Sequence, residues 1–157
     1  MAGSRRLCAE PSRGLGVIRV FWDTNLFIYL WEDYGVHSKK VRALLNRMVE
    51  RGDKLCTSTM TLGEVLVSPT KAGRTDLVTD YEAVLTHSDV LLIPFDRSCA
   101  RTYARVRGDK SITPPDAIQL SCAAQAGCDL FITNDERLSR KIIPGIHFIV
   151  SLDRAFL

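Results

Sequence analysis

Apolar and polar positions along the chain follow two alternating patterns. The first is the short, nearly continuous apolar run, and its strongest example is VIRVFWDTN at residues 17–25, between Gly16 and Asp23. Its β-branched and aromatic residues predict a strand that is buried on both faces of a parallel sheet. Similar short segments predict four more strands, at residues 54–58, 90–94, 130–133 and 146–150.

The second pattern is the recurrence of apolar residues at intervals of three and four, which predicts amphipathic helices. Pro69 is expected to end one of these helices, and the two prolines at 114 and 115 suit the first turn of another. The predicted helices cover residues 24–31, 41–52, 59–67, 71–88, 96–107, 113–126 and 134–141. Strands that alternate with helices imply an α/β fold, with a central parallel five-stranded sheet covered by helices on both faces.

Length and composition indicate the number of domains. With 157 residues, 46% hydrophobic and 25% charged, the chain suits one globular domain, expected at residues 17–157 after a loose polar tail at 1–16. The net charge of +3 is compatible with a phosphate-bearing partner. Five cysteines without a CxxC pair indicate reduced thiols and a cytoplasmic protein. No apolar run reaches the ~18 residues that a membrane helix needs.

Four acidic residues are expected near the carboxyl ends of the predicted parallel strands, where α/β proteins bind their ligands. Asp23 follows the first strand, Asp135 follows the fourth, Glu64 lies in the helix after the second, and Asp116 lies in the first turn of the PPDAIQL helix. The carboxyl ends of parallel strands meet at one edge of a sheet, so these carboxylates are expected to converge there. Like charges ~4 Å apart repel by about 4 kcal/mol at an effective dielectric near 20. A cluster of this kind therefore predicts a bound Mg²⁺ or Mn²⁺ and metal-assisted phosphodiester hydrolysis.

Each acid also has an ordinary structural explanation. Asp23 and Asp135 suit the N-cap position of a helix, and Thr113 with Asp116 has the spacing of a capping box. Glu64 could be a solvated helix residue. Four independent explanations of this kind give no reason for the acids to gather at one edge, so the shared metal site is the preferred interpretation.

Three motifs, in this order and spacing, resemble a known family. They are VFWDTNLFIYL at the first strand, TLGEVLVSP around Glu64, and PPDAIQLSCAAQAGCDLFITND near the end. Over nearly all of residues 17–150 the chain resembles PIN-domain ribonucleases, most closely the VapC-type toxin of VapBC toxin–antitoxin pairs. The resemblance implies a three-layer PIN-like fold, metal-dependent cleavage of RNA, a homodimer and inhibition by a cognate antitoxin.

The resemblance also implies roles for individual residues. Asp23, Glu64, Asp116 and Asp135 match the catalytic, metal-binding acids of the family, which hold Mg²⁺ or Mn²⁺. Two further positions match polar residues that order those carboxylates or metal-bound water, as neighbours of a metal site commonly do. They are Asn25 and Thr133.

Basic residues beside these acids suit an RNA backbone. Arg97, Arg101 and Arg105 recur at intervals of four on one predicted helix face, and Arg137 follows Asp135 closely. We predict that these arginines contact RNA phosphates. For the first three, a solvated helix face is the favoured explanation.

Other functions remain to be weighed. A haloacid dehalogenase-type phosphatase needs a second acid two residues after the first, where this chain has Asn25. A phospho-accepting receiver domain needs an acidic pair after the first strand and a lysine after the fifth, where Ser151 and Leu152 stand. The non-enzymatic alternative is a PIN-fold module that binds RNA or protein without cleaving it.

Overall fold

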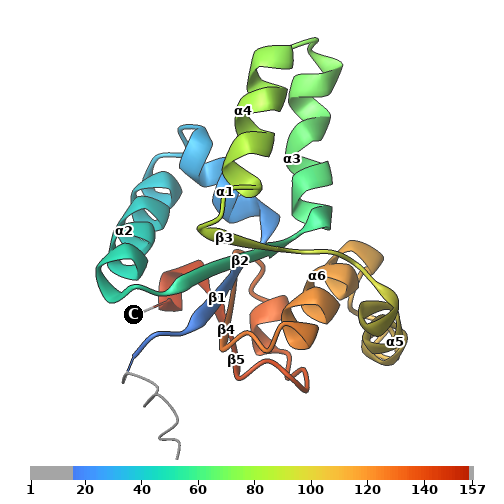
Figure 1. Cartoon of the computed structure of the whole chain (residues 1–157). Coiled ribbons are helices and arrows are strands. Elements are labelled where there is room, and N and C mark those ends of the chain that lie inside the picture. The colour runs from blue at the N-terminus through green and yellow to red at the C-terminus, as the bar shows by residue number, and fades with distance from the viewer. Residues whose placement is uncertain (1–15, 156–157) are drawn as a thin grey trace, which may run out of the picture.

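A computed structural model describes residues 16–155, which form a five-stranded parallel sheet (Figure 1). The strands stand in the order β3-β2-β1-β4-β5, so β1 lies at the centre and both of its neighbours run parallel to it. Their bounds are β1 Arg19–Trp22, β2 Lys54–Ser58, β3 Val90–Ile93, β4 Leu130–Thr133 and β5 Phe148–Ser151. The predicted α/β fold with a parallel five-stranded sheet is therefore confirmed.

Helices connect the strands and cover both faces of the sheet (Figure 1). Two short 3₁₀ turns, η1 (Leu138–Arg140) and η2 (Leu152–Arg154), lie near the C-terminal end of the described chain. The α-helices are α1 Thr24–Trp31, α2 Val36–Arg51, α3 Thr59–Lys71, α4 Thr75–Leu85, α5 Arg97–Val106 and α6 Pro114–Gln125. This three-layer arrangement is the one that the sequence resemblance implies.

The central strand contributes to two separate cores because its side chains alternate between the sheet faces. Phe21 packs with α5 and α6 on one face and stacks on Phe131 of β4, with ring centroids 4.9 Å apart. Val20 and Trp22 point to the other face, where they pack with α1, α2 and α3. All three of these β1 side chains are fully buried. Burial on both faces fixes β1 in place and with it the residue that follows, Asp23.

Several boundaries differ from the sequence-based predictions; α2, for example, begins at Val36 and not at 41. Pro69 does not end α3, which continues to Lys71 with the proline ring buried. The next helix starts only at Thr75, after a turn at Gly73 with φ +66°, a conformation that suits glycine. The predicted helices at 59–67 and 71–88 are thus a helical hairpin with shifted ends.

The C-terminal region holds less helix than predicted. Residues 134–141, expected as a short helix, form only the 3₁₀ turn η1, because the Asp135 side chain accepts bonds from the backbone N–H groups of Arg137 and Leu138 at 2.8 and 3.4 Å. Such local side-chain bonds compete with a regular helix.

The described part of the chain leaves some predictions open. The predicted loose tail falls almost entirely on residues 1–15, which lie outside the described residues, as does Cys8. The other four cysteines are buried free thiols, as predicted. No helix within residues 16–155 has the length and apolar character to cross a membrane.

Candidate active site

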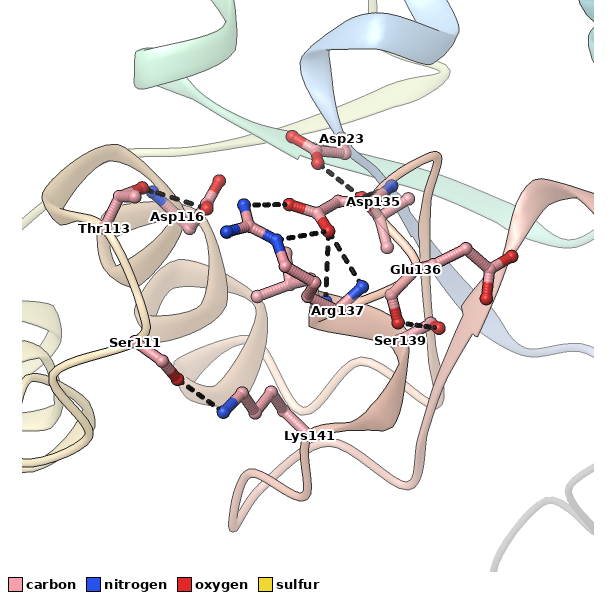
Figure 2. Close-up of polar contacts among 11 residues, drawn as sticks. Asp23, Ser111, Thr113, Asp116, Asp135, Glu136, Arg137, Ser139 and Lys141 are labelled. Atoms are coloured by element: carbon pink, nitrogen blue, oxygen red, sulfur yellow. Dashed lines mark hydrogen bonds and ion pairs between the residues drawn. The ribbon is translucent and has the colours of Figure 1, made fainter.

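The carboxyl ends of β1 and β4 bring the first pair of predicted residues together. Asp23 directly follows β1, and its backbone N–H donates to the carbonyl oxygen of Ile132 in β4 at 3.0 Å. Thr133, the last residue of β4, donates from its hydroxyl to Asp23 Oδ2 at 2.8 Å (Figure 2). The fully buried Thr133 is therefore hydrogen-bonded to the Asp23 carboxylate and restricts its orientation.

Asp23 is also the N-cap of α1. Its Oδ1 accepts a hydrogen bond from the Thr24 backbone N–H at 2.8 Å. Protein atoms surround the carboxyl group densely, and this burial raises the pKa of Asp23 to about 6. The bonds from Thr133 and Thr24 act in the opposite direction, while the nearby charges of Asp116 and Glu64 raise the pKa further. Within residues 16–155, Asp23 thus forms no ion pair with a basic side chain.

Glu64 reaches the same edge from α3. Its Oε1 accepts a hydrogen bond from the Thr24 hydroxyl at 2.9 Å, although the residue as a whole is exposed. The structure therefore places Asp23 and Glu64 on either side of one threonine. Since Glu64 adds to the pKa rise of Asp23, the two carboxylates act on each other electrostatically.

A buried polar network beneath these acids was not predicted from the sequence. Gln119 of α6, only 1% exposed, donates from Nε2 to the hydroxyl oxygens of Thr24 at 3.0 Å and Thr61 at 2.7 Å. Its Oε1 accepts from Ser58 Oγ at 2.5 Å. Every polar atom of this amide is thus paired with a residue near the carboxyl ends of β1 and β2.

The network has a direct effect on the site. Because the Thr24 hydroxyl oxygen accepts from Gln119, its single proton is available to Glu64. A sequence signal for this role exists, since Gln119 follows Asp116 by three positions and so shares its helix face. Its partner at position 24 could not be inferred, because it lies 95 residues away along the chain.

Asp116 lies in the first turn of α6. Thr113, the N-cap, donates from its hydroxyl to Asp116 Oδ2 at 2.9 Å and accepts from the Asp116 backbone N–H at 3.4 Å (Figure 2). The capping arrangement considered for these two residues is therefore present. Asp116 nevertheless lies near the other acids at the carboxyl ends of the strands, which we call the acidic edge, because its charge contributes to the raised pKa of Asp23.

Asp135 differs from the other three acids because it has its own cation. Arg137 Nη2 lies 3.1 Å from Asp135 Oδ2, and Nε lies 3.4 Å from Oδ1. These hydrogen bonds lower the pKa of Asp135. Figure 2 shows the Arg137 guanidinium extending between the carboxylates of Asp135 and Asp116, and Asp116 correspondingly raises the pKa of Arg137, after Asp135 itself. Thr133 connects Asp135 with Asp23, since the hydroxyl that donates to Asp23 also accepts from the Asp135 backbone N–H at 3.1 Å.

The donor set suits a hard divalent cation only in part. Its oxygens are of the right type, and the raised pKa of Asp23 shows a carboxylate that a cation would stabilise. Within residues 16–155, however, no three His, Cys, Asp or Glu side chains are grouped closely enough to hold one metal ion together. Mg²⁺ typically takes one or two protein carboxylates and completes its shell with water. The arrangement fits that kind of site rather than a closed cage of four acids.

The remaining predicted residues lie on α1, on α5 and after Asp135. Asn25 is exposed at the start of α1, and the described chain offers its side chain no hydrogen bond. Arg97, Arg101 and Arg105 lie exposed on α5, and Arg105 Nη2 donates to Thr102 Oγ1 at 3.2 Å. Arg137 is thus the predicted RNA-binding arginine that directly contacts one of the four acids.

The fold and this edge define a class: a parallel α/β protein with acids after β1 and β4 and at the start of α6. The family model for the PIN domain matches residues 20–142, so the chain belongs to the PIN domain family. The resemblance seen in the three sequence motifs is thereby confirmed at the level of the family. A comparison with functionally curated proteins finds no match.

Solved structures with a similar fold come from toxin–antitoxin systems. VapBC2 from Rickettsia felis bound to a promoter DNA fragment is 16% identical with a TM-score of 0.67, covering 85% of this chain and 98% of that one. DNA-bound VapBC from Salmonella typhimurium is 22% identical with a TM-score of 0.63, covering 87% and 99%. VapC20 from Mycobacterium tuberculosis, described as a toxin that cleaves the sarcin-ricin loop, is 15% identical with a TM-score of 0.55, covering 71% and 86%. At these identities the likeness establishes the fold.

Proposed function

We propose that this PIN-domain protein is an endoribonuclease that hydrolyses RNA phosphodiester bonds with the help of Mg²⁺ or Mn²⁺. The observation that carries the proposal is the Asp23 carboxyl group, which is held by Thr133, flanked by the charges of Asp116 and Glu64, and raised in pKa to about 6. A buried acid with shifted pKa beside other acids is characteristic of a functional site.

Each acid has a part in this proposal. Asp23, with Glu64 or Asp116, would hold the cation, which when bound supplies polarisation of a phosphate oxygen and activation of water. Thr133 and Thr24 fix the orientation of Asp23 and Glu64. Asp135 holds Arg137 at the edge of the site, where the guanidinium is placed to contact a phosphate. Asn25, which is exposed, is expected to order water beside the acids.

The protein is further proposed to be the toxin of a toxin–antitoxin pair acting in the cytoplasm. The support is the fold, which it shares with VapBC complexes from several bacteria. A cognate antitoxin partner and a homodimer are therefore expected. Co-expression with the product of a neighbouring gene, followed by light scattering of the purified complex, would test both partners.

A non-cleaving PIN-fold module that binds RNA or protein is the competing function. The ion pair of Arg137 with Asp135 favours it, because this arginine neutralises one acid without any metal. The two functions differ in one measurable respect. A binding module would leave RNA intact whatever metal is present.

Cleavage of a labelled total RNA pool decides between them. The purified protein is incubated with Mg²⁺, with Mn²⁺ and with EDTA, alongside Asp116→Asn and the matched control Asp89→Asn, which removes an exposed acid at the opposite, amino end of the strands. We expect metal-dependent fragments from the wild type and Asp89→Asn and none from Asp116→Asn. Intact RNA in every lane, from folded protein free of antitoxin, would contradict the nuclease proposal, as would full activity of Asp116→Asn.

A further inference from the structure

A hollow lies between α5, the loop that precedes α6, and the segment from the end of η1 to Pro144. Its volume is about 510 Å³, within the ~300–1,000 Å³ range of small-molecule sites. Basic side chains and apolar side chains share its lining. The ones that matter here are Arg105, Arg140 and Lys141, and Val106, Ile112 and Ile143.

The hollow carries unneutralised positive charge. The acid in its lining, Asp109, pairs with Lys141 Nζ at 2.7 Å, so these two charges cancel. Arg105 donates to the uncharged Thr102 hydroxyl, and within residues 16–155 neither Arg105 nor Arg140 forms an ion pair with a carboxylate. Two guanidinium groups therefore face this space without an anionic partner, above a floor of aliphatic side chains.

Two residues that line the hollow are close along the chain to residues that contact the acids. Arg140 ends the 3₁₀ turn that Arg137 precedes, and residues three apart in such a turn lie on the same side. Ile112 of the floor is followed by Thr113, which holds Asp116. Figure 2 shows Lys141, at one border of the hollow, with its amine against Ser111 on the same side of the site as Thr113. A chain of phosphates that passes Arg137 would thus reach Arg140 next.

We propose that this hollow binds a nucleotide of the single-stranded RNA substrate adjacent to the cleaved bond. Arg105 and Arg140 bind its phosphates, and its base packs on Ile142, which is exposed, whereas Val106, Ile112 and Ile143 are buried beneath the hollow. Proteins that hold single strands without reading their sequence combine a positively charged groove with side chains, usually aromatic, against which the bases pack. In this hollow an aliphatic side chain takes the place of the aromatic one. The inference rests on the proposed function, because it takes RNA as the substrate and the acidic edge as the place of cleavage.

RNA binding in EDTA tests the proposal separately from cleavage. Fluorescence anisotropy with a short fluorescein-labelled single-stranded RNA is measured for the wild type, Arg105→Gln and Arg140→Gln. The matched controls are Arg42→Gln and Lys39→Gln, both on α2 and outside the hollow. Both arginines of the hollow, like both controls, are exposed, so the variants are expected to fold.

The expected result is a selective loss. Arg105→Gln and Arg140→Gln each weaken RNA binding about three- to tenfold and reduce the slope of log affinity against log salt by about 0.7, as one lost phosphate contact does for a single strand. The controls stay within about twofold of the wild type by the same reasoning. Ile142→Gln, at a rim residue that is 93% exposed, weakens RNA binding but leaves binding of inorganic polyphosphate unchanged, because only RNA carries bases.

Three results would overturn the proposal. Unchanged affinity in both hollow variants, or an equal loss in Arg42→Gln, would show that the hollow is not a specific contact. Tighter binding of an acidic peptide than of RNA, dependent on the same two arginines, would assign the hollow to a protein partner. Since no metal or cleavage enters this assay, selective loss in a protein that cuts no RNA would support the subsite while contradicting the nuclease proposal.

Discussion

Replacing Asp23 by asparagine should stabilise the metal-free protein at neutral pH. The pKa of Asp23 is raised from 3.8 to about 6, mainly by burial, so the folded protein holds the carboxyl proton more tightly than the unfolded chain does. The stabilisation from this proton is fully present below pH 3.8 and is lost as the pH rises through about 6. A shift of this size corresponds to about 3 kcal/mol, at 1.36 kcal/mol per pKa unit.

The measured gain in the free energy of unfolding should be smaller than the value that the pKa shift alone gives. Part of the Asp23 surface still contacts solvent, which screens the charge, and an amide nitrogen in place of Oδ2 no longer accepts the Thr133 hydroxyl bond, at a cost of about 1 kcal/mol. The expected gain for Asp23→Asn is therefore about 1–2 kcal/mol near pH 8. It should shrink towards zero or reverse as the pH falls below about 5.

Urea unfolding in EDTA, followed by tryptophan fluorescence, measures the free energy of unfolding of both proteins near pH 8 and below pH 5. The comparison must be made between the two proteins at each pH, because carboxylates with lowered pKa, such as Asp109 at about 2, make the whole protein respond to acid in the opposite direction. If Asp23→Asn were less stable than the wild type near pH 8, the ionised Asp23 carboxylate would not destabilise the folded protein, and the argument would be refuted. Adding Mn²⁺ should stabilise the wild type and leave Asp23→Asn largely unaffected.

Two further substitutions test the surroundings of the acids. Gln119→Leu leaves the buried hydroxyls of Thr24 and Thr61 without their amide partner, so urea unfolding should show a loss of about 2–4 kcal/mol; unchanged stability would contradict the network. Arg137→Gln removes the cation that lowers the pKa of Asp135, so calorimetry should show tighter Mn²⁺ binding than in the wild type. Weaker binding would indicate that Arg137 supports the metal site instead of competing with the metal.

Local patterns were sufficient to predict the framework of the site. The apolar run at Val20, Phe21 and Trp22 marks a strand buried on both faces, and a buried strand that stops at an acid places that acid at a sheet edge. These features depend on periodicity, which the sequence carries directly. The role of Thr133 was implied by the family resemblance, since chain order alone does not show that β4 pairs with β1 and so brings Thr133 beside Asp23.

Long-range side-chain pairing could not be predicted in the same way. Gln119 and Thr24 meet only because α6 packs against the start of α1, and no local signal reports that contact. Pro69 remained inside α3 because its burial in the tertiary fold overrides a local preference. The Asp135 carboxylate caps its own following turn, so a segment with helical periodicity became the single 3₁₀ turn η1.

The most direct test of the account is the origin of the oxygen in the cleaved ends. Hydrolysis assisted by a metal at Asp23 and its neighbours uses water, so RNA cleaved in ¹⁸O-labelled water with Mn²⁺ should carry one labelled oxygen in each new terminal phosphate. Cleavage should cease in EDTA. Fragments that end in unlabelled 2′,3′-cyclic phosphates, formed equally well in EDTA, would show attack by the RNA's own 2′-hydroxyl and would contradict a metal-dependent nuclease at this edge.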